Sequence, residues 1–223
     1  MKTAFIFSAG RGERLRPITD RVPKALCTVH GITLLEYHLE NLAAAGIERV
    51  VINHAYLGGQ IRQLAGDGRR WGVEICYAPE PPGGLETAGG IINALPLLGK
   101  EPFLTVNADI FSDYQFASLA LPATSMVHLV LVNKPHYLAH ADFNLSATGQ
   151  LDNLNRTYTF AGIACYRPQV FASMKFGRYS LVPLLRELTA KKQASGEVFQ
   201  GYWIDIGTPA RLGLANGRKY RSS

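Results

Sequence analysis

The stretch FSAGRGERLRPITDRVPKAL, residues 7–26, indicates the fold more clearly than any other part of the sequence. It follows the apolar run TAFIFSA, residues 3–9, and a short apolar run that ends at glycine is typical of a buried strand. Gly10 and Gly12 let the main chain approach a ligand closely, and backbone N–H groups at such a turn bind anions. A solvated turn would use the same residue types. The stretch therefore leaves two interpretations, a phosphate cradle and an ordinary surface turn.

Two common phosphate-binding motifs do not fit the loop. The phosphate loop of NTPases, GxxxxGK[ST], is absent from it. The dinucleotide fingerprint GxGxxG matches only at Gly10 and Gly12, because Leu15 occupies the third glycine position. Arg14 and Lys24 could neutralise a triphosphate instead. On the basic residues alone, however, an exposed surface loop is the favoured interpretation for both Arg14 and Lys24.

Strand and helix patterns alternate along the chain. The clearest helix, residues 32–46, has Thr33 and Glu36 in a capping box and ends at Gly46. Apolar runs predict strands at residues 3–9, 49–55, 73–79, 102–110, 128–134, 159–166 and 201–208. Further helices are predicted at residues 56–66, from Glu86 or Thr87 onward, at 180–192 and at 209–220. The alternation predicts an α/β fold with a Rossmann-like, mostly parallel, mixed sheet and helices on both faces.

Length and composition fit one domain that binds small anions. The 223 residues show no linker or repeat, which predicts a single domain over residues 1–223. The net charge of +6 suits anionic small molecules. No dense basic run with interleaved aromatic residues occurs, so a nucleic acid partner is disfavoured. The three cysteines form no CxxC pair, so we expect neither disulfides nor a zinc site, and a cytoplasmic protein. No signal peptide or run of transmembrane length is present, so we expect no membrane partner.

The loop as a whole supports the phosphate interpretation. It contains Ala9, Gly10, Gly12, Arg14, Leu15, Pro17 and Thr19, and then Pro23 and Lys24. This order resembles the signature of the sugar-phosphate nucleotidyltransferases, A-G-x-G-x-R-[LM]-x-P-x-T followed by P-K. The resemblance implies a nucleotide-diphospho-sugar transferase (GT-A-like) fold, with a nucleotide-binding half at residues 1–120 and a sugar-binding half at residues 121–223.

The resemblance also assigns roles within the loop. It implies that the nucleotide contacts Ser8, Ala9, Gly10, Arg11, Gly12 and Lys24. Arg14 would hold the departing pyrophosphate, and Lys24 would offset charge between the two phosphates. Ser8 stands where alanine is usual and Glu13 where threonine is usual. Since Glu13 is negative, we expect its side chain to turn away from the phosphates.

Two aspartates follow predicted strands, Asp109 in VNAD and Asp205 in YWIDIGT. Most such aspartates cap helices or form turns. Mg²⁺, however, is commonly held by one or two carboxylates together with substrate phosphates and water. The resemblance implies that Asp109 and Asp205 share one Mg²⁺ ion, with Asp109 counted among the catalytic residues. The family usually has glycine where this chain has Ala108, which should narrow the pocket slightly.

Three further segments resemble substrate-binding parts of the family. GGLETAGGI, residues 83–91, resembles its nucleobase loop, which implies that Gly84, Leu85, Thr87 and Gly89 lie near the base and ribose. Glu86 replaces the usual glycine and would either face this loop or favour the helix N-terminus by its charge. HADFNL and TFAGIACY resemble sugar-binding segments, which implies sugar contacts from Asp142 and the Gly162 backbone. Asn107 would face the ribose or the sugar.

These residues imply one reaction. A sugar 1-phosphate attacks the α-phosphorus of a nucleoside triphosphate and releases pyrophosphate, and no general base is needed because the attacking phosphate is already ionised. Segments such as LETAGG and FSDYQF resemble the branch that transfers UMP from UTP to N-acetylmuramate α-1-phosphate in cell-wall recycling. The alternatives are a mannose- or glucose-1-phosphate nucleotidyltransferase that uses GTP or dTTP, and a non-catalytic nucleotide-sugar sensor. Oligomeric state is not visible, and a monomer is plausible.

The histidines suggest no separate site. His38 lies on the inner face of the helix at residues 32–46, where we expect a partly buried, hydrogen-bonded side chain rather than a ligand. His136 and His140 are four residues apart in KPHYLAH, where a surface loop is favoured over a metal-binding pair.

Overall fold

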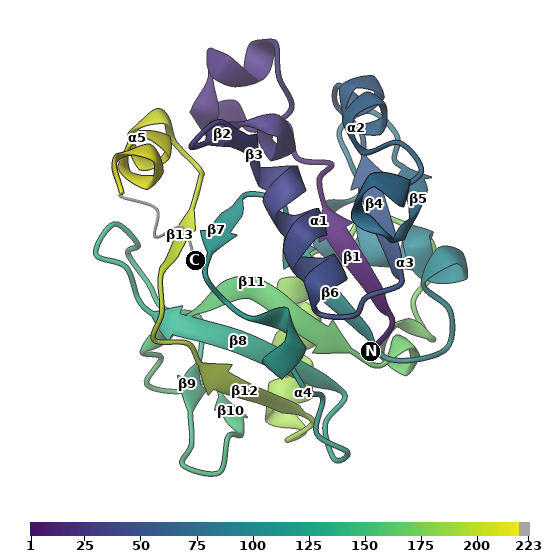
Figure 1. The fold of residues 1–223 in the computed structure, drawn as a ribbon. Helices are drawn as coiled ribbons and strands as arrows, with labels where there is room; N and C mark the ends of the chain where they lie inside the picture. Colours follow the sequence, from purple (N-terminus) through teal and green to yellow (C-terminus); the bar gives the residue numbers. More distant parts are fainter. Residues whose placement is uncertain (219–223) are drawn as a thin grey trace.

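The computed structural model describes residues 1–218 and is built around one seven-stranded sheet (Figure 1). The strands of this sheet are β1 (Thr3–Phe7), β4 (Arg49–His54), β5 (Glu74–Pro79), β6 (Phe103–Asn107), β8 (Val127–Asn133), β11 (Tyr158–Tyr166) and β12 (Ala194–Val198). They are ordered β12-β8-β11-β6-β1-β4-β5. All neighbours are parallel except β11, which is antiparallel to both β6 and β8. The predicted mostly parallel, mixed sheet is confirmed.

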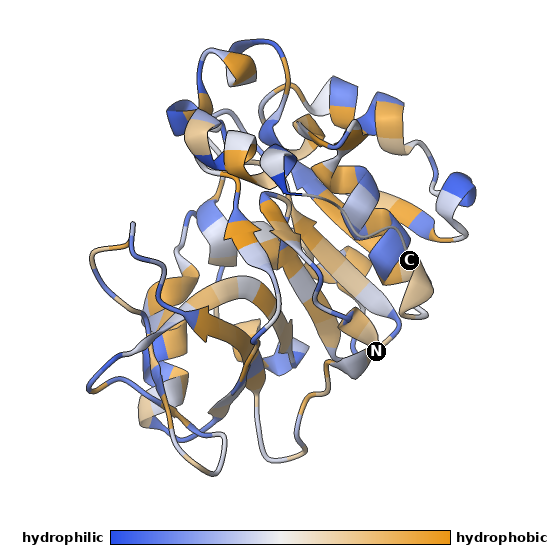
Figure 2. Ribbon diagram, turned by 60° about the vertical axis from the view of Figure 1, so that its left-hand side comes forward, coloured by the Kyte–Doolittle hydropathy of each residue, from blue (hydrophilic) through white to orange (hydrophobic). Residues whose placement is uncertain are grey.

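Helices cover both faces of the sheet, as predicted. They are α1 (Leu34–Ala44), α2 (Gly58–Ala65), α3 (Glu86–Leu98), α4 (Leu181–Ala190) and α5 (Pro209–Gly217). Successive residues of β1 point to opposite faces, because side chains alternate along a strand. Ile6 packs in a cluster with residues of α1 and α2, whereas Phe5 packs in a cluster with residues of α3 and α4. Figure 2 shows the apolar strands enclosed between these layers.

Local signals explain where the helices begin. Thr33 Oγ1 accepts a hydrogen bond from Glu36 N at 3.1 Å, and Glu36 Oε2 accepts one from Thr33 N at 3.1 Å. This capping box starts α1 where the sequence predicts it. Ser180 caps α4 by accepting from Val182 N at 3.2 Å, and α5 begins at Pro209, where a missing N–H costs nothing.

The order of the strands fixes where a ligand can bind. The chain runs from β1 through α1 to β4 and on to β5, away from β1 on one side. Helix α3 then carries it back to β6 on the other side of β1. In open α/β sheets, ligands bind beyond the carboxyl ends of the strands where the strand order reverses in this way. The reversal here lies between β1 and β6.

Several short elements were not predicted from the sequence. The loop after β1 forms three single-turn 3₁₀ helices rather than a long helix: Glu13–Leu15, Ile18–Asp20 and Lys24–Leu26. Short strands pair as β2 (Thr28–Val29) with β3 (Ile32–Thr33), β7 (Ile110–Ser112) with β13 (Trp203–Asp205), and β9 (Asn144–Leu145) with β10 (Leu151–Asp152). Of these six strands, β13 alone lies within a predicted strand, the one at residues 201–208. Edge strand β12 was also missed. No helix within residues 1–218 has the length and hydropathy needed to cross a membrane.

Candidate active site

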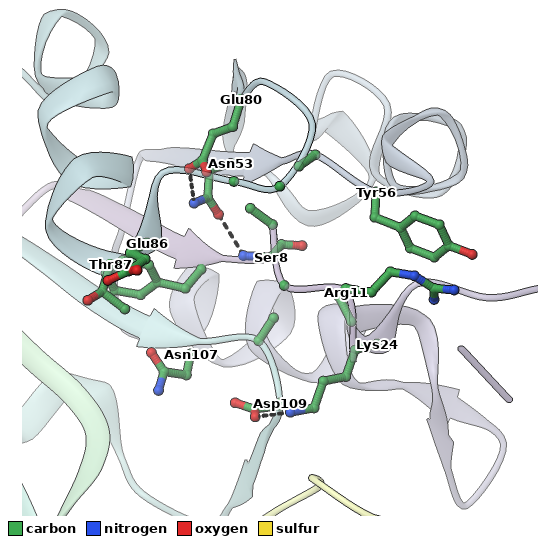
Figure 3. A pocket seen from close by; sticks show the side chains of 18 of the residues that line it. Ser8, Arg11, Lys24, Asn53, Tyr56, Glu80, Glu86, Thr87, Asn107 and Asp109 are labelled. Carbon is green, nitrogen blue, oxygen red and sulfur yellow. Dashed lines mark hydrogen bonds and ion pairs between the residues drawn. The ribbon is translucent and has the colours of Figure 1, made fainter. Parts of the chain in front are cut away.

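A pocket of about 770 Å³ opens at the carboxyl ends of β1 and β6 (Figure 3). Its volume lies within the range of small-molecule and cofactor sites. The loop after β1, the turn at Lys24, the ends of β4 and β5, the start of α3 and the end of β6 all contribute to its wall. The pocket therefore lies at the point where the strand order reverses.

The structure brings many of the sequence-predicted residues to this pocket. Those that line it are Ser8, Ala9, Gly10, Arg11, Lys24, Gly84, Thr87, Asn107 and Asp109. The others, within the part of the chain that the structure describes, lie outside its lining: Gly12, Arg14, Leu85, Gly89, Asp142, Gly162 and Asp205. The individual substrate contacts of all these residues stay predictions.

A chain of hydrogen bonds joins the ends of three strands behind the pocket. Ser8 N donates to Asn53 Oδ1 at 2.6 Å, and Asn53 Nδ2 donates to Glu80 Oε1 at 2.6 Å (Figure 3). Glu80 Oε2 in turn accepts from Leu85 N at 2.7 Å, just before α3. Asn53 is 2% exposed, so its amide is committed to these contacts. Leu85 thus contributes its backbone N–H to this chain of hydrogen bonds, and its side chain is buried.

Sequence reasoning missed both Asn53 and Glu80, and also Tyr56. Each is a polar or aromatic residue directly after an apolar run, at the carboxyl end of β4 or β5. That position was the available signal, since these strand ends face the same edge as β1 and β6. The Tyr56 ring lies 3.8 Å from the Arg11 guanidinium carbon, so Arg11 reaches the pocket with its charge stacked on an aromatic face.

Two of the predicted glycines are explained by packing. Gly12 has φ 72°, and a Cβ added there would lie 2.9 Å from Thr19 Cγ2. Thr19 Oγ1 also donates to Gly12 O at 2.8 Å, so Gly12 sets the shape of the loop. At Gly89, an added Cβ would lie 2.3 Å from Gly177 O. This close approach fixes α3 against residues 177–179 and explains Gly89 without a ligand.

Glu13 and Arg14 are neighbours in the loop but lie differently relative to the pocket. Glu13 lines the pocket, whereas Arg14 is exposed and outside the lining. The Glu13 carboxylate lies 3.8 Å from both Arg11 Nε and Arg16 Nη1. Two neighbouring guanidinium groups offset its charge, and the expectation that its side chain turns away from the phosphates stays a prediction. The role of Arg14 toward pyrophosphate stays a prediction.

Lys24 and Asp109 form an ion pair at the edge of the pocket (Figure 3). Lys24 begins a 3₁₀ turn and Asp109 follows β6, so two segments 85 residues apart meet here. Their side chains are only 19% and 23% exposed. At such burial, each charge interacts more strongly than at the surface. The ion pair thus places a cation and a carboxylate together beside the nucleotide-sized cavity.

Asp205 lies on the segment next to Asp109. Pairing of β7 with β13 sets Asp205 opposite Ile110, and Ile206 N donates to Asp109 O at 2.7 Å. Asp205 Oδ1 accepts from Arg211 Nη1 and from Tyr137 Oη, both at 2.8 Å. Burial, and then the hydrogen bond to Asp205, raise the pKa of Tyr137 to about 12.

Asp109 and Asp205 fit a divalent cation whose remaining ligands come from the substrate and water. Asp109 and Asp205 supply carboxylate oxygens from adjacent segments, which is the ligand type that Mg²⁺ prefers. Within residues 1–218, no group of three or more histidine, cysteine, aspartate or glutamate side chains could hold a metal alone. A cation here would therefore complete its coordination with phosphate and water oxygens, as Mg²⁺ commonly does.

The sugar-side residues occupy the bulge of β11. Its register shifts between Phe160 and Ala164, and Gly162 within that bulge has φ 75°. A Cβ at Gly162 would lie 2.7 Å from Asn107 Nδ2, so only glycine lets Asn107 sit beside this strand. Asp142 Oδ2 accepts from Phe160 N at 2.9 Å, which holds the loop before β9 against β11. One carboxylate oxygen of Asp142 is thus used structurally.

His38 is buried as predicted, and its ring lies against the backbone at the end of β6. The ring is 5% exposed, and its Nε2 has no hydrogen-bond partner among residues 1–218. The ring lies against the backbone of residues 107–110, and burial lowers its pKa to about 4. The backbone at residues 107–110 hydrogen-bonds to the ring, so within the described residues the expected hydrogen-bonded side chain is confirmed except at Nε2. A neutral ring fits this apolar position between α1 and the end of β6.

Comparisons with known proteins agree with this geometry. A family model described as Nucleotidyl transferase matches residues 3–136. The chain is 45% identical to an N-acetylmuramate alpha-1-phosphate uridylyltransferase of Neisseria meningitidis, over 94% of both chains. It is 30% identical to the protein of that name from Caulobacter vibrioides, over 97% of this chain and 96% of the relative.

A solved structure shows the same fold. A putative glucose-1-phosphate thymidylyltransferase from Bacillus anthracis superposes with a TM-score of 0.84 at 17% identity, covering 99% of this chain and 97% of that one. The matched segment of the family model includes the loop after β1, Lys24 and Asp109. The chain therefore belongs to the nucleotidyl transferase family.

Proposed function

We propose that the chain transfers UMP from UTP to N-acetylmuramate α-1-phosphate, giving UDP-N-acetylmuramate and pyrophosphate. The observation that carries the proposal is its 45% identity, over 94% of both chains, to a uridylyltransferase of that specificity. The pocket supports it, because a cavity of about 770 Å³ beside a lysine–aspartate pair suits a nucleoside triphosphate. Cell-wall recycling is the corresponding process.

The reaction needs alignment and charge neutralisation more than proton transfer. An oxygen of the sugar phosphate attacks the α-phosphorus, and the bond from that phosphorus to the β-phosphate bridging oxygen breaks. Because the attacking phosphate is ionised near neutral pH, no general base is required. This explains why the pocket lining contains no nucleophile–base pair. Positioning and electrostatic stabilisation then supply most of the rate enhancement.

Each part of the pocket has a proposed task. The backbone at Ala9 and Gly10 binds the departing phosphates, and Arg11 lies beside them. Lys24 turns its ammonium from Asp109 toward the α-phosphate and offsets the negative charge gathered there. Asn107 orients the ribose or the sugar next to the bulge of β11.

Asp109 and Asp205 would hold the divalent cation, which we propose to be Mg²⁺. When bound, the ion supplies positive charge to the phosphate that is being transferred. Lys24 and Arg211, which pair with the two aspartates in this structure, keep the carboxylates compensated until substrate is present. The three cysteines are free thiols, which supports a cytoplasmic location.

The test is a pyrophosphate-release screen of the full chain with Mg²⁺, using four nucleoside triphosphates against several sugar 1-phosphates. We expect release with UTP and N-acetylmuramate α-1-phosphate, and a UDP-sugar product of matching mass. A strong preference for GTP with mannose 1-phosphate would overturn the substrate assignment. Tight binding of UTP without turnover of any sugar phosphate would favour a nucleotide-sugar sensor.

A further inference from the structure

A second, smaller recess lies in the sugar-side half and is strongly basic. Its volume is about 360 Å³, and its lining consists of Lys134, Ala139, His140, Ala141, Asn155 and Arg156. We call it the basic recess. It has no carboxylate in its lining, and its basic side chains are exposed. Within residues 1–218, no carboxylate oxygen lies within 4.0 Å of the charged nitrogens of Lys134 or Arg156.

Positive charge also accumulates behind the basic recess. Arg186 donates to Asn153 Oδ1 at 3.0 Å and to the Asp142 carbonyl, so it is fixed below the loop. Burial lowers the pKa of Arg186, and repulsion from Arg156 lowers it further. Asp142 offsets part of this charge, but its Oδ2 is bound to the Phe160 backbone. The exposed cations of the recess therefore lack a protein counter-charge.

The recess faces the same edge of the sheet as the active-site pocket. Strand β8 is antiparallel to β11, which is antiparallel to β6, so β8 and β6 end at one edge. Lys134 directly follows β8, and Arg156 lies two residues before β11, where Tyr158 pairs with Asn133. Two strand spacings, about 10 Å, separate β6 from β8 laterally. Thr105 and Leu129 both pair with Ala164, so β8, which ends at Asn133, extends further toward this edge than β6, which ends at Asn107. Figure 1 shows the loop after β8 extending toward β13 and α5 at this edge.

The proposed acceptor sugar phosphate has two anionic groups, one for the pocket and one for the basic recess. The anomeric phosphate of the acceptor must reach the pocket near Lys24 and Asp109, at the end of β6. N-acetylmuramate carries a second anion, a carboxylate on an ether side chain of another ring carbon. A pyranose ring lying across the bulge of β11, beside Asn107 and Gly162, would direct that side chain toward β8.

We infer that the basic recess binds the carboxylate of the acceptor sugar, with Arg156 as the principal donor and His140 as a second contact. The inference rests on the proposed function and adds a specificity determinant to it. A planar guanidinium can bind a carboxylate through two parallel hydrogen bonds, which a neutral hydroxyl cannot match. The recess would thus distinguish N-acetylmuramate 1-phosphate from N-acetylglucosamine 1-phosphate, which has the phosphate but no carboxylate.

The test compares these two acceptors in the wild-type protein and in Arg156→Gln, His140→Asn and Arg69→Gln. Arg69 is the matched control, because it is an exposed arginine paired with Asp67 far from this edge. We expect Arg156→Gln to lower kcat/KM for N-acetylmuramate 1-phosphate by about 10- to 100-fold. The value for N-acetylglucosamine 1-phosphate should change less than about threefold, and Arg156→Lys should restore part of the preference.

Two results would overturn the inference. Equal losses for both acceptors would mean that Arg156 acts on the shared phosphate or on the fold. If Arg156→Gln and His140→Asn both keep the wild-type preference for N-acetylmuramate 1-phosphate over N-acetylglucosamine 1-phosphate, the recess does not contact the carboxylate. Where turnover of N-acetylglucosamine 1-phosphate is too slow to measure, calorimetric titration of both sugar phosphates gives the ratio of their dissociation constants, to which the same two outcomes apply. Failure of the wild-type protein to use N-acetylmuramate 1-phosphate would instead refute the proposed function.

Discussion

Lys24 and Asp109 bring the first and second quarters of the chain together at one point of the pocket wall. Neither residue is positioned by its own element alone. Lys24 depends on the loop shape set by Gly12 and Thr19, and Asp109 depends on the backbone hydrogen bond to Ile206. Single substitutions here test chemistry, because the surrounding backbone is held by other contacts.

Replacing Lys24 by alanine should lower kcat by about 100- to 1,000-fold, since a lost charge at a developing phosphate contact costs about that much in related settings. Lys24→Arg keeps the positive charge, so its kcat should fall less than that of Lys24→Ala. Steady-state turnover at saturating UTP measures both variants. Thermal unfolding of the same samples is the control, and Lys24→Ala with kcat within threefold of the wild type would contradict the assigned role.

His38 should make stability depend on pH. Its pKa is lowered from 6.5 to about 4 on folding, so the unfolded state binds more protons between those values. The free energy of unfolding should therefore fall as pH drops from about 6.5 to 4, by up to roughly 3 kcal/mol. Urea unfolding at several pH values across this range measures the free energy of unfolding, which should depend less steeply on pH in His38→Gln than in the wild type. The exposed His136→Gln is the control, and equal slopes in His38→Gln and the wild type would refute this prediction.

At the scale of elements, the hydrogen-bonded chain through Asn53 ties the ends of β1, β4 and β5 to the start of α3. This buried amide therefore links the strand ends to the start of α3 in addition to the backbone pairing of β1, β4 and β5. A polar group left unpaired in such a place is costly.

Asn53→Ala should lower the free energy of unfolding by about 1–3 kcal/mol and raise KM for UTP more than it lowers kcat. The reason is that Ser8 N and Glu80 lose their shared partner. Chemical unfolding and steady-state kinetics measure the two effects. Asn93→Ala is a matched control, since Asn93 makes one exposed hydrogen bond to Pro79 O at 3.0 Å. Equal effects of the two variants would argue against the linking role of Asn53.

Elements with strong local signals could be predicted from the sequence, whereas the pairing of the short strands could not. The capping box of Thr33 and Glu36 and the apolar runs of β1 and β6 act within a few residues. The pairing of β7 with β13 joins segments about ninety residues apart through three residues each, which is too short for a periodic pattern. Site prediction has the same limit, because Asn53 and Glu80 act through contacts with Ser8, Leu85 and each other that are distant in the sequence or involve the backbone.

At the scale of the whole molecule, the sheet places two sites along one edge. The nucleotide-sized pocket lies between β1 and β6, and the basic recess lies at the end of β8. The resemblance in the loop after β1 predicted the first site, because its residues are contiguous. The second depends on β11 reversing direction beside β6, which brings Arg156 and Lys134 together from different loops. No contiguous motif marks such a site.

The central claim is that Asp109 and Asp205 together hold the cation at which UMP is transferred to the sugar phosphate. The most direct measurement is the rate of UDP-N-acetylmuramate formation with Mg²⁺ by the wild-type protein, Asp109→Ala and Asp205→Ala, with thermal unfolding recorded in parallel. We predict product formation by the wild type and losses of at least about 100-fold in each folded variant. Near-normal turnover by either variant would contradict the claim.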